Sequence, residues 1–292
     1  MILQDSTAAQ KVGLRRIQKQ SMRERLANLP WWLIMLGVVI ALTLWLIAKQ
    51  PTFSQAFSII RSGMGVTITI TIISYLISLV LGLFTGLGRV SKNIAAKNFS
   101  TFYVELMRGI PLLVSIFFIA LVLVPGAVGL IGLLGQKLVE MGLTGLGTPL
   151  ANMNNRAISM SVRAVIALAI TYGAFSAEIF RAGIQSVHFG QMEAARSQGM
   201  SHGQAMWHVI LPQAIRNVLP AIGNDFIAML KDSSLVSVLA VRDVTQIARQ
   251  YAGHSFRFPE AYTTLSVMYL TMTLVLSLIV KMIERRISTN GK

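Results

Sequence analysis

The chain has 292 residues, of which 54% are hydrophobic and only 13% are charged, a composition too apolar for an ordinary soluble domain. Its 26 Lys and Arg outnumber 11 Asp and Glu, but they cluster between apolar runs rather than along an amphipathic face, which argues against nucleic-acid binding. The absence of cysteine excludes a disulfide framework, a thiolate metal site and a cysteine nucleophile.

Six segments are apolar for long enough to cross a membrane, because the hydrocarbon layer is about 30 Å thick and takes about 20 residues of helix. They are 31–48, 64–87, 102–124, 159–184, 218–240 and 265–283. Each is predicted to be helical, since an open strand in lipid would leave backbone polar groups unpaired. We therefore expect an all-α, polytopic membrane helix bundle with about six transmembrane helices.

Basic residues predict the orientation of these spans. They are frequent in the first 30 residues, at 89–97 and at the C-terminal end, and basic loops stay on the cytoplasmic side. Both termini are therefore expected in the cytoplasm, although predicted outer loops also carry Arg242 and Arg249. The first span is expected to be retained, because Lys49 and Pro51 follow it instead of a small-residue cleavage site.

Residues 125–150 form an apolar, glycine-rich stretch with Lys137 and Glu140 near its middle. Glycine at this frequency is poor for a full span. We interpret the stretch as an insertion on the outer face with one short interfacial helix around 131–141. A seventh span is the alternative.

In the small-residue segment 82–86, Gly82 and Gly86 are four apart, a spacing that lets membrane helices approach closely. The pattern is common, so it only indicates that this face contacts another helix.

Residues 190–212 are predicted to form two short helices joined by a tight turn. Gly199 stands where a helix would end in a left-handed residue, and Ser201 with Gln204 forms a capping box for the next helix. Pro212 is expected to close that helix before the next span. On the cytoplasmic side, such a compact helical knob is suited to docking into a groove of a partner. The alternative is an ordinary loop lying on the bilayer surface.

The spacing of this segment carries a resemblance to a known family. Glu193-Ala194-Ala195, three residues, Gly199, nine residues, Val209, one residue and Leu211-Pro212 resembles the EAA signature of ATP-binding-cassette (ABC) importer permeases. Val209 stands where that family usually has isoleucine. The stretches 105–113, 177–191 and 231–238 look like those of polar amino acid permeases of the histidine/glutamine type. The resemblance runs from about residue 63 to the C-terminal end and leaves out the glycine-rich insertion.

The resemblance implies the fold of a type I ABC importer permease. Together with the charge and hydropathy pattern, which alone defines the first 62 residues, it gives a basic cytoplasmic segment (1–30), a first transmembrane helix with an outer loop (31–62), a permease core (63–284) and a cytoplasmic tail (285–292). It also implies that coupling helices within 190–212 receive motion from an ATPase. The residues assigned to this coupling are Gly190, Glu193, Ala194, Ala195, Gly199, Leu211 and Pro212.

The same resemblance implies partners in a bacterial plasma membrane. They are ABC ATPase subunits, a second permease that is identical or homologous, a soluble substrate-binding protein, membrane lipid and an amino acid substrate, with no nucleic acid. The chain lacks the GxxxxGK[ST] loop that holds nucleotide phosphates, so it is not expected to be an enzyme. It is expected to carry no cofactor, and ATP and Mg belong to the ATPase subunits.

Ionisable residues inside spans are costly and usually face a partner or a pathway. Glu105 and Arg108 are three residues apart, as are Glu178 and Arg181, so each pair can neutralise itself on one helix face. Glu105, Arg108 and Arg181 are interpreted as members of structural ion pairs. Glu178 is interpreted either in that way or as a contact for the ammonium group of the substrate.

Two further residues are candidates for the substrate pocket. Ser115 lies one turn inside the third span, and Asp232 lies in the fifth. Lys231 and Asp232 together predict a break in that helix, and their charges either line the pathway or pair with neighbours. The four histidines show no metal-ligand spacing, so no metal is expected.

Two other functions fit the sequence less well than an ATP-driven importer. An ion-coupled secondary amino acid transporter would use Glu178 or Asp225 as its coupling group, but it predicts inverted repeats and broken helices, which are not evident. A membrane scaffold without transport would not require polar residues deep in several spans.

Overall fold

The computed structural model describes residues 31–289, so the predicted basic segment 1–30 and the end of the predicted tail lie outside the described residues. Two compact units are distinguished, with the division after Leu44. Of the first unit, the structure describes only the beginning of α3 (Trp31–Lys49). The rest of this section concerns the second unit, which begins at Trp45.

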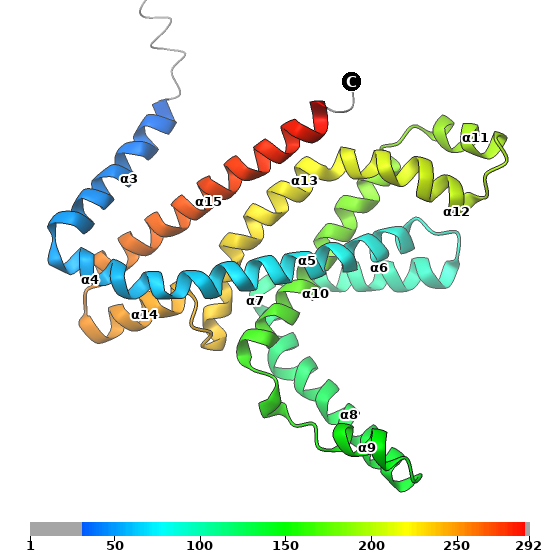
Figure 1. Ribbon diagram of the computed structural model, residues 1–292, viewed down its shortest axis with the longest axis horizontal. Coiled ribbons are helices and arrows are strands. Elements are labelled where there is room, and N and C mark those ends of the chain that lie inside the picture. The colour runs from blue at the N-terminus through cyan, green and yellow to red at the C-terminus, as the bar shows by residue number, and fades with distance from the viewer. Residues whose placement is uncertain (1–30, 290–292) are drawn as a thin grey trace, which may run out of the picture. The chain divides into compact units, whose positions relative to one another are not determined.

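The described part of the second unit is built of helices, without a strand (Figure 1). After α3 the order is α4 (Pro51–Ile60), η1 (Arg61–Gly63), α5 (Met64–Arg89), α6 (Ile94–Gly109), α7 (Leu112–Phe118), η2 (Ile119–Leu123), α8 (Val124–Glu140), α9 (Thr144–Ala151), η3 (Asn155–Ala157), α10 (Met160–Gln185), α11 (Phe189–Ser197), α12 (His202–Ala205), η4 (Met206–Ile210), α13 (Leu211–Asp232), η5 (Ser233–Leu239), α14 (Val244–Ser255) and α15 (Phe258–Thr289). The predicted all-α membrane architecture is confirmed.

Four of the described helices are long and apolar enough to cross a membrane: Pro51–Arg89, Leu112–Glu140, Met160–Gln185 and Phe258–Arg286. A shorter apolar helix covers Ile34–Lys49. The second and sixth predicted spans lie within α5 and α15, and the fourth lies within α10 apart from Ser159, the N-cap of that helix. The third and fifth differ from the prediction in where their helices break.

The third predicted span, 102–124, is wrong as a single helix. The chain is extended at Ile110, with φ −103° and ψ 135°, so α6 ends before Pro111 and α7 begins after it. Proline disfavours a helical conformation of the preceding residue and lacks the N–H that a helix needs. The apolar run across this point therefore belongs to two helices.

The glycine-rich stretch is also more regular than predicted. Instead of one short helix around 131–141, α7, η2 and α8 form a continuous helix from Leu112 to Glu140. Helix α9 then packs back on α8 at glycines: a Cβ on Gly147 would lie 2.7 Å from the backbone N of Val139. The glycines therefore allow close packing between these two helices instead of interrupting the first.

Among the described residues, the two π-helical segments each end two residues before a proline. η2 leads to Pro125 and η4 leads to Pro212, and each proline lies in the first turn of the following α-helix. A π turn shifts the hydrogen-bond register by one residue, which suits a residue that has no N–H to donate. Pro212 was predicted to close the preceding helix. This prediction is wrong, because the helix continues through Pro212 into α13.

The fifth predicted span corresponds to α13 followed by a 3-10 helix, rather than to one helix over 218–240, and it is not among the four helices long and apolar enough to cross a membrane. The α-helix ends at Asp232 and η5 continues from Ser233. This confirms the break that Lys231 and Asp232 predicted.

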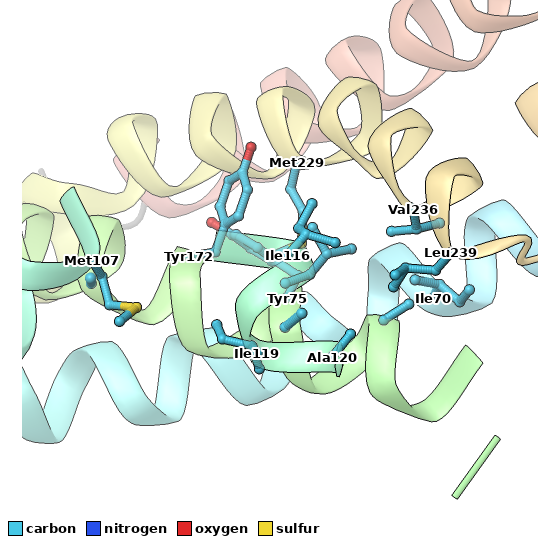
Figure 2. Packing of buried hydrophobic residues seen from close by; sticks show 14 of the residues in the cluster. Ile70, Tyr75, Met107, Ile116, Ile119, Ala120, Tyr172, Met229, Val236 and Leu239 are labelled. Carbon is cyan, nitrogen blue, oxygen red and sulfur yellow. The ribbon is translucent and has the colours of Figure 1, made fainter. Parts of the chain in front are cut away.

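The predicted small-residue face of α5 packs against α10. A Cβ on Gly86 would lie 2.9 Å from both Ala177 O and Phe180 Cβ, and a Cβ on Gly82 would meet Ser176. The main buried cluster lies around this contact and includes Tyr75, Ile116, Tyr172 and Met229 (Figure 2). Since backbone can approach only where a side chain is missing, these glycines fix how closely α5 and α10 pack.

Helices α4 and α14, like α9, were not predicted. Asp243 caps α14 by accepting the Gln246 N–H at 2.8 Å, and it is fully buried. Burial raises the pKa of the Asp243 carboxyl. Helix α14 packs against α4 and α15 through a second core cluster that includes Ala56, Val244 and Ala261. Helix α14 is thus held between α4, which begins the long helix Pro51–Arg89, and the long helix α15.

Candidate functional site

The segment 189–210, which we call the foot, consists of two short helices and a π turn. Helix α11 ends at Ser197, Gly199 has φ +83°, and α12 begins after Ser201. The Ser201 side chain accepts the Gln204 N–H, and the Gln204 side chain accepts the Ser201 N–H at 2.8 Å. The two short helices, the left-handed glycine and the capping box are confirmed.

The foot has a buried side and an exposed side. Ile210 is buried with Ile184 and Ala214, and Met206 and Val209 pack against them. Trp207 is 62% exposed and Phe189 is 72% exposed. Trp207 therefore does not share the apolar side of its neighbours.

The residues of the EAA-like signature divide between these two sides. Ala195 and Leu211 are buried, whereas Glu193, Ala194 and Gly199 are exposed. Gly190 lies at the start of α11, where its N–H donates to His188 Nδ1 at 3.1 Å. Gln213 Nε2 reaches Gln191 Oε1 at 3.3 Å and joins α13 to α11. The alanine and leucine hold the foot together, and the acidic and glycine positions remain open to a partner.

Five charged residues from three helices meet near the end of α10 that leads to the foot. Arg89 Nη1 lies 2.8 Å from Glu178 Oε2, and Arg89 Nη2 lies 3.2 Å from Glu105 Oε1. Arg181 forms an ion pair with Glu178 in the same helix, as predicted, and Arg108 Nη1 lies 3.9 Å from Glu178 Oε2. Arg89 thus links α5, α6 and α10.

The predicted pairing of Glu105 with Arg108 is corrected by this arrangement. In the structure Glu105 pairs with Arg89, and Arg108 turns to Glu178. Spacing of three residues allows a pair on one helix, but a guanidinium from a neighbouring helix competes for the same carboxylate. Arg89 was interpreted only as an orientation signal, because its partners are distant in sequence.

A second polar group lies between α10 and α13. Tyr172 OH donates to Asp232 Oδ2 at 2.6 Å, and Ser176 Oγ donates to Asp225 Oδ2 at 3.3 Å. Tyr75 of α5 stacks on Phe226, with 4.6 Å between the ring centroids. Figure 2 labels Tyr75 and Tyr172 in the packed region around Met229.

The two aspartates have no basic partner in the part of the chain that the structure describes. They are seven residues apart on α13, close to two helical turns. This group is therefore acidic, in contrast to the arginine-rich group around Glu178.

Ser115 lies in α7 and is buried, and its hydroxyl has no hydrogen-bond partner within residues 31–289. Buried hydroxyls normally have a partner, so Ser115 can still accept or donate a bond to a ligand. Over the same residues, His, Asp and Glu side chains form no group of three or more that could hold a metal ion.

Comparisons with known proteins identify this architecture. The chain matches the model of the family described as binding-protein-dependent transport system inner membrane component over residues 78–289. It is 31% identical to the glutamine transport system permease protein GlnP of Escherichia coli (strain K12), over 79% of this chain and 94% of that protein. It is 33% identical to the nopaline transport system permease protein NocM of Agrobacterium fabrum, over 79% of this chain and 88% of that protein.

A solved structure agrees with these relatives. The crystal structure of an amino acid ABC transporter with histidines contains a chain with a TM-score of 0.62 and 37% sequence identity to this one. The match covers 83% of this chain and 97% of the other.

Proposed function

The chain belongs to the family of binding-protein-dependent transport system inner membrane components. From this membership we propose a role for the foot, for the charged group around Glu178 and for the acidic group of Asp225 and Asp232. It is a multi-pass permease subunit of an ATP-driven amino acid importer, and it does not itself hydrolyse ATP. An ion-coupled secondary transporter is not supported.

The observation that carries the proposal is the two-sided foot. Its buried side is fixed to α10 and α13, and its exposed side presents Phe189 and Trp207. Exposed aromatic side chains on a rigid helical element are typical anchors of a protein interface. The foot therefore docks into an ATPase subunit on the cytoplasmic side of the membrane, through a surface that includes Gly190, Glu193, Ala194, Gly199 and the adjoining Pro212. That subunit binds ATP and Mg. The buried Ala195 and Leu211 contribute by holding the foot in shape.

Motion of the foot is transmitted to the spans. α12, η4 and α13 form one continuous helical run from His202 to Asp232, so a push on the foot moves the helix that carries Asp225 and Asp232. Two ATPase subunits, a second permease and a soluble binding protein complete the transporter. The core 63–284 then alternates between inward-open and outward-open states.

The acidic group holds the ammonium group of the substrate. An ammonium ion needs a carboxylate that no resident cation neutralises, and Asp225 and Asp232 meet that condition. Glu178, the earlier candidate, contacts three guanidinium groups and is better suited to hold α5, α6 and α10 together. Ser115 is retained as a candidate for a polar contact.

We expect Asp232→Asn to raise the KM for amino acid uptake by about tenfold, the loss of one charge-assisted contact. Assembly with the ATPase should be retained, because asparagine can still accept the bond from Tyr172. The measurement is uptake into proteoliposomes as a function of amino acid concentration. Glu178→Gln is the comparison: if it raises KM as much and Asp232→Asn does not, the ammonium site lies at Glu178.

The function as a whole is tested by purifying the chain together with its ATPase and binding protein. An amino acid supplied with the binding protein should stimulate ATP hydrolysis by the complex. If the complex assembles but no proteinogenic amino acid stimulates hydrolysis, the assignment as an amino acid importer is contradicted.

A further inference from the structure

A cavity of about 590 Å³ lies between the foot and the turn that joins α5 to α6. Four basic side chains line it and no acidic one does: Arg89, Lys97, His188 and His202. Such a lining favours an anion.

Several of these donors are available. The side chains of Lys97 and His202 make no hydrogen bond or ion pair with residues that the structure describes. His188 Nδ1 accepts the Gly190 N–H, so in the neutral ring the proton lies on Nε2 and remains free to donate. The first turn of α11 also begins here, at Phe189, and a helix N-terminus favours negative charge. Arg89 is different, since it is already bound to two glutamates.

Most of the remaining wall of the cavity is apolar, and three uncharged polar residues, Ser91, Gln185 and Ser186, complete it. The apolar part is formed by Val90, Ile184, Val187, Phe189, Met192, Met206 and Ile210. A free phosphate ion gains nothing from such a wall, whereas a lipid presents an anionic phosphate attached to an apolar chain. The combination of basic donors and an apolar wall therefore favours a lipid.

We propose that this cavity binds the phosphate headgroup of an anionic phospholipid in the cytoplasmic leaflet. The lipid joins the foot to the α5–α6 turn, and its charge strengthens the coupling between the ATPase and the spans. This inference rests on the proposed function only in that the foot must lie on the cytoplasmic side.

The test uses the whole transporter, with its ATPase and binding protein, in vesicles of phosphatidylcholine with or without phosphatidylglycerol. Phosphatidylglycerol should increase ATP-driven uptake by the wild type. Lys97→Glu places a negative charge in the cavity and should lower that increase about fivefold, since a basic residue near anionic lipid contributes about 1 kcal/mol. Lys92→Glu, on the same turn but outside the cavity lining, should keep the increase.

Three other outcomes would overturn the proposal. Equal responses of the Lys97 and Lys92 variants would show that only the general surface charge matters. Inorganic phosphate that reproduces the increase in phosphatidylcholine vesicles would assign the cavity to a soluble anion. Loss of uptake by Lys97→Glu in phosphatidylcholine alone would place Lys97 in the coupling contact itself. A wild-type complex without ATP-driven uptake in either vesicle would instead contradict the proposed function.

Discussion

Replacing Gly199 by valine is expected to lower ATP-driven amino acid uptake by about tenfold. Gly199 has φ +83°, and a left-handed conformation costs an L-residue with a Cβ roughly 1–2 kcal/mol, with β-branched residues worst placed. No atom lies within 4 Å of a Cβ built there, so the backbone angle alone causes the strain. The turn between α11 and α12 would change shape, and the exposed side of the foot would lose its fit to the ATPase.

Gly199→Asn is the matched control, because asparagine tolerates the left-handed conformation far better than valine. It should retain most of the uptake, while both variants remain in the membrane in normal amounts. Uptake into proteoliposomes and copurification of the ATPase subunit measure the two consequences. Equal loss in the valine and asparagine variants would show that the turn conformation is not what matters at this position.

Replacing Arg89 by methionine is expected to destabilise the transporter and reduce uptake severalfold. Arg89 has a largely buried side chain and bonds to Glu105 and Glu178 on two other helices. Hydrogen bonds to charged groups contribute about 1.5–3 kcal/mol each when buried, and the exposed Glu105 end contributes less. Glu178 keeps Arg181 and Arg108, so the carboxylate is not left unpaired. We expect the apparent Tm of the purified complex to fall by several degrees.

A double-mutant cycle separates the two bonds of Arg89. Combining Arg89→Met with Glu178→Gln should show strong coupling, and combining it with Glu105→Gln should show weak coupling. Arg89→Lys should fall between the wild type and methionine, because an ammonium group cannot bond both carboxylates in the way a guanidinium fork does. Additive effects with Glu178→Gln would contradict the role of Arg89 as a link between α5 and α10.

Local features of the fold could be predicted from the sequence, because neighbouring residues determine them. The left-handed Gly199 and the capping box of Ser201 and Gln204 depend only on a few adjacent residues, and both were found as expected. The break after Asp232 and the helix contact at Gly82 and Gly86 were predicted for the same reason.

Where helices begin and end depends on single residues that average hydropathy does not reveal. The run 102–124 is apolar throughout and was therefore predicted as one helix, although Pro111 was the available signal for a break. Helix α14 was missed because its charged residues resembled a loop, yet the Asp243 cap and the apolar spacing from Val244 to Ala252 could have identified it.

The charged network could not be predicted from spacing within one helix. Glu178 and Arg89 are 89 residues apart, and only the packing of α5 on α10 brings them together. The same packing changes the interpretation of Glu178, since a carboxylate among three guanidinium groups is a poor site for an ammonium ion. Asp225 and Asp232 became the better candidates once their partners were known.

The position of the foot relative to the membrane is the central claim, and the absence of native cysteine permits a direct measurement of it. A single cysteine in place of the exposed Gln198 can be treated with a membrane-impermeant thiol reagent in right-side-out and inside-out vesicles. We predict labelling of this chain only in inside-out vesicles, with less labelling when the ATPase subunit is bound. Labelling in intact right-side-out vesicles would place the foot on the outer face and contradict the account.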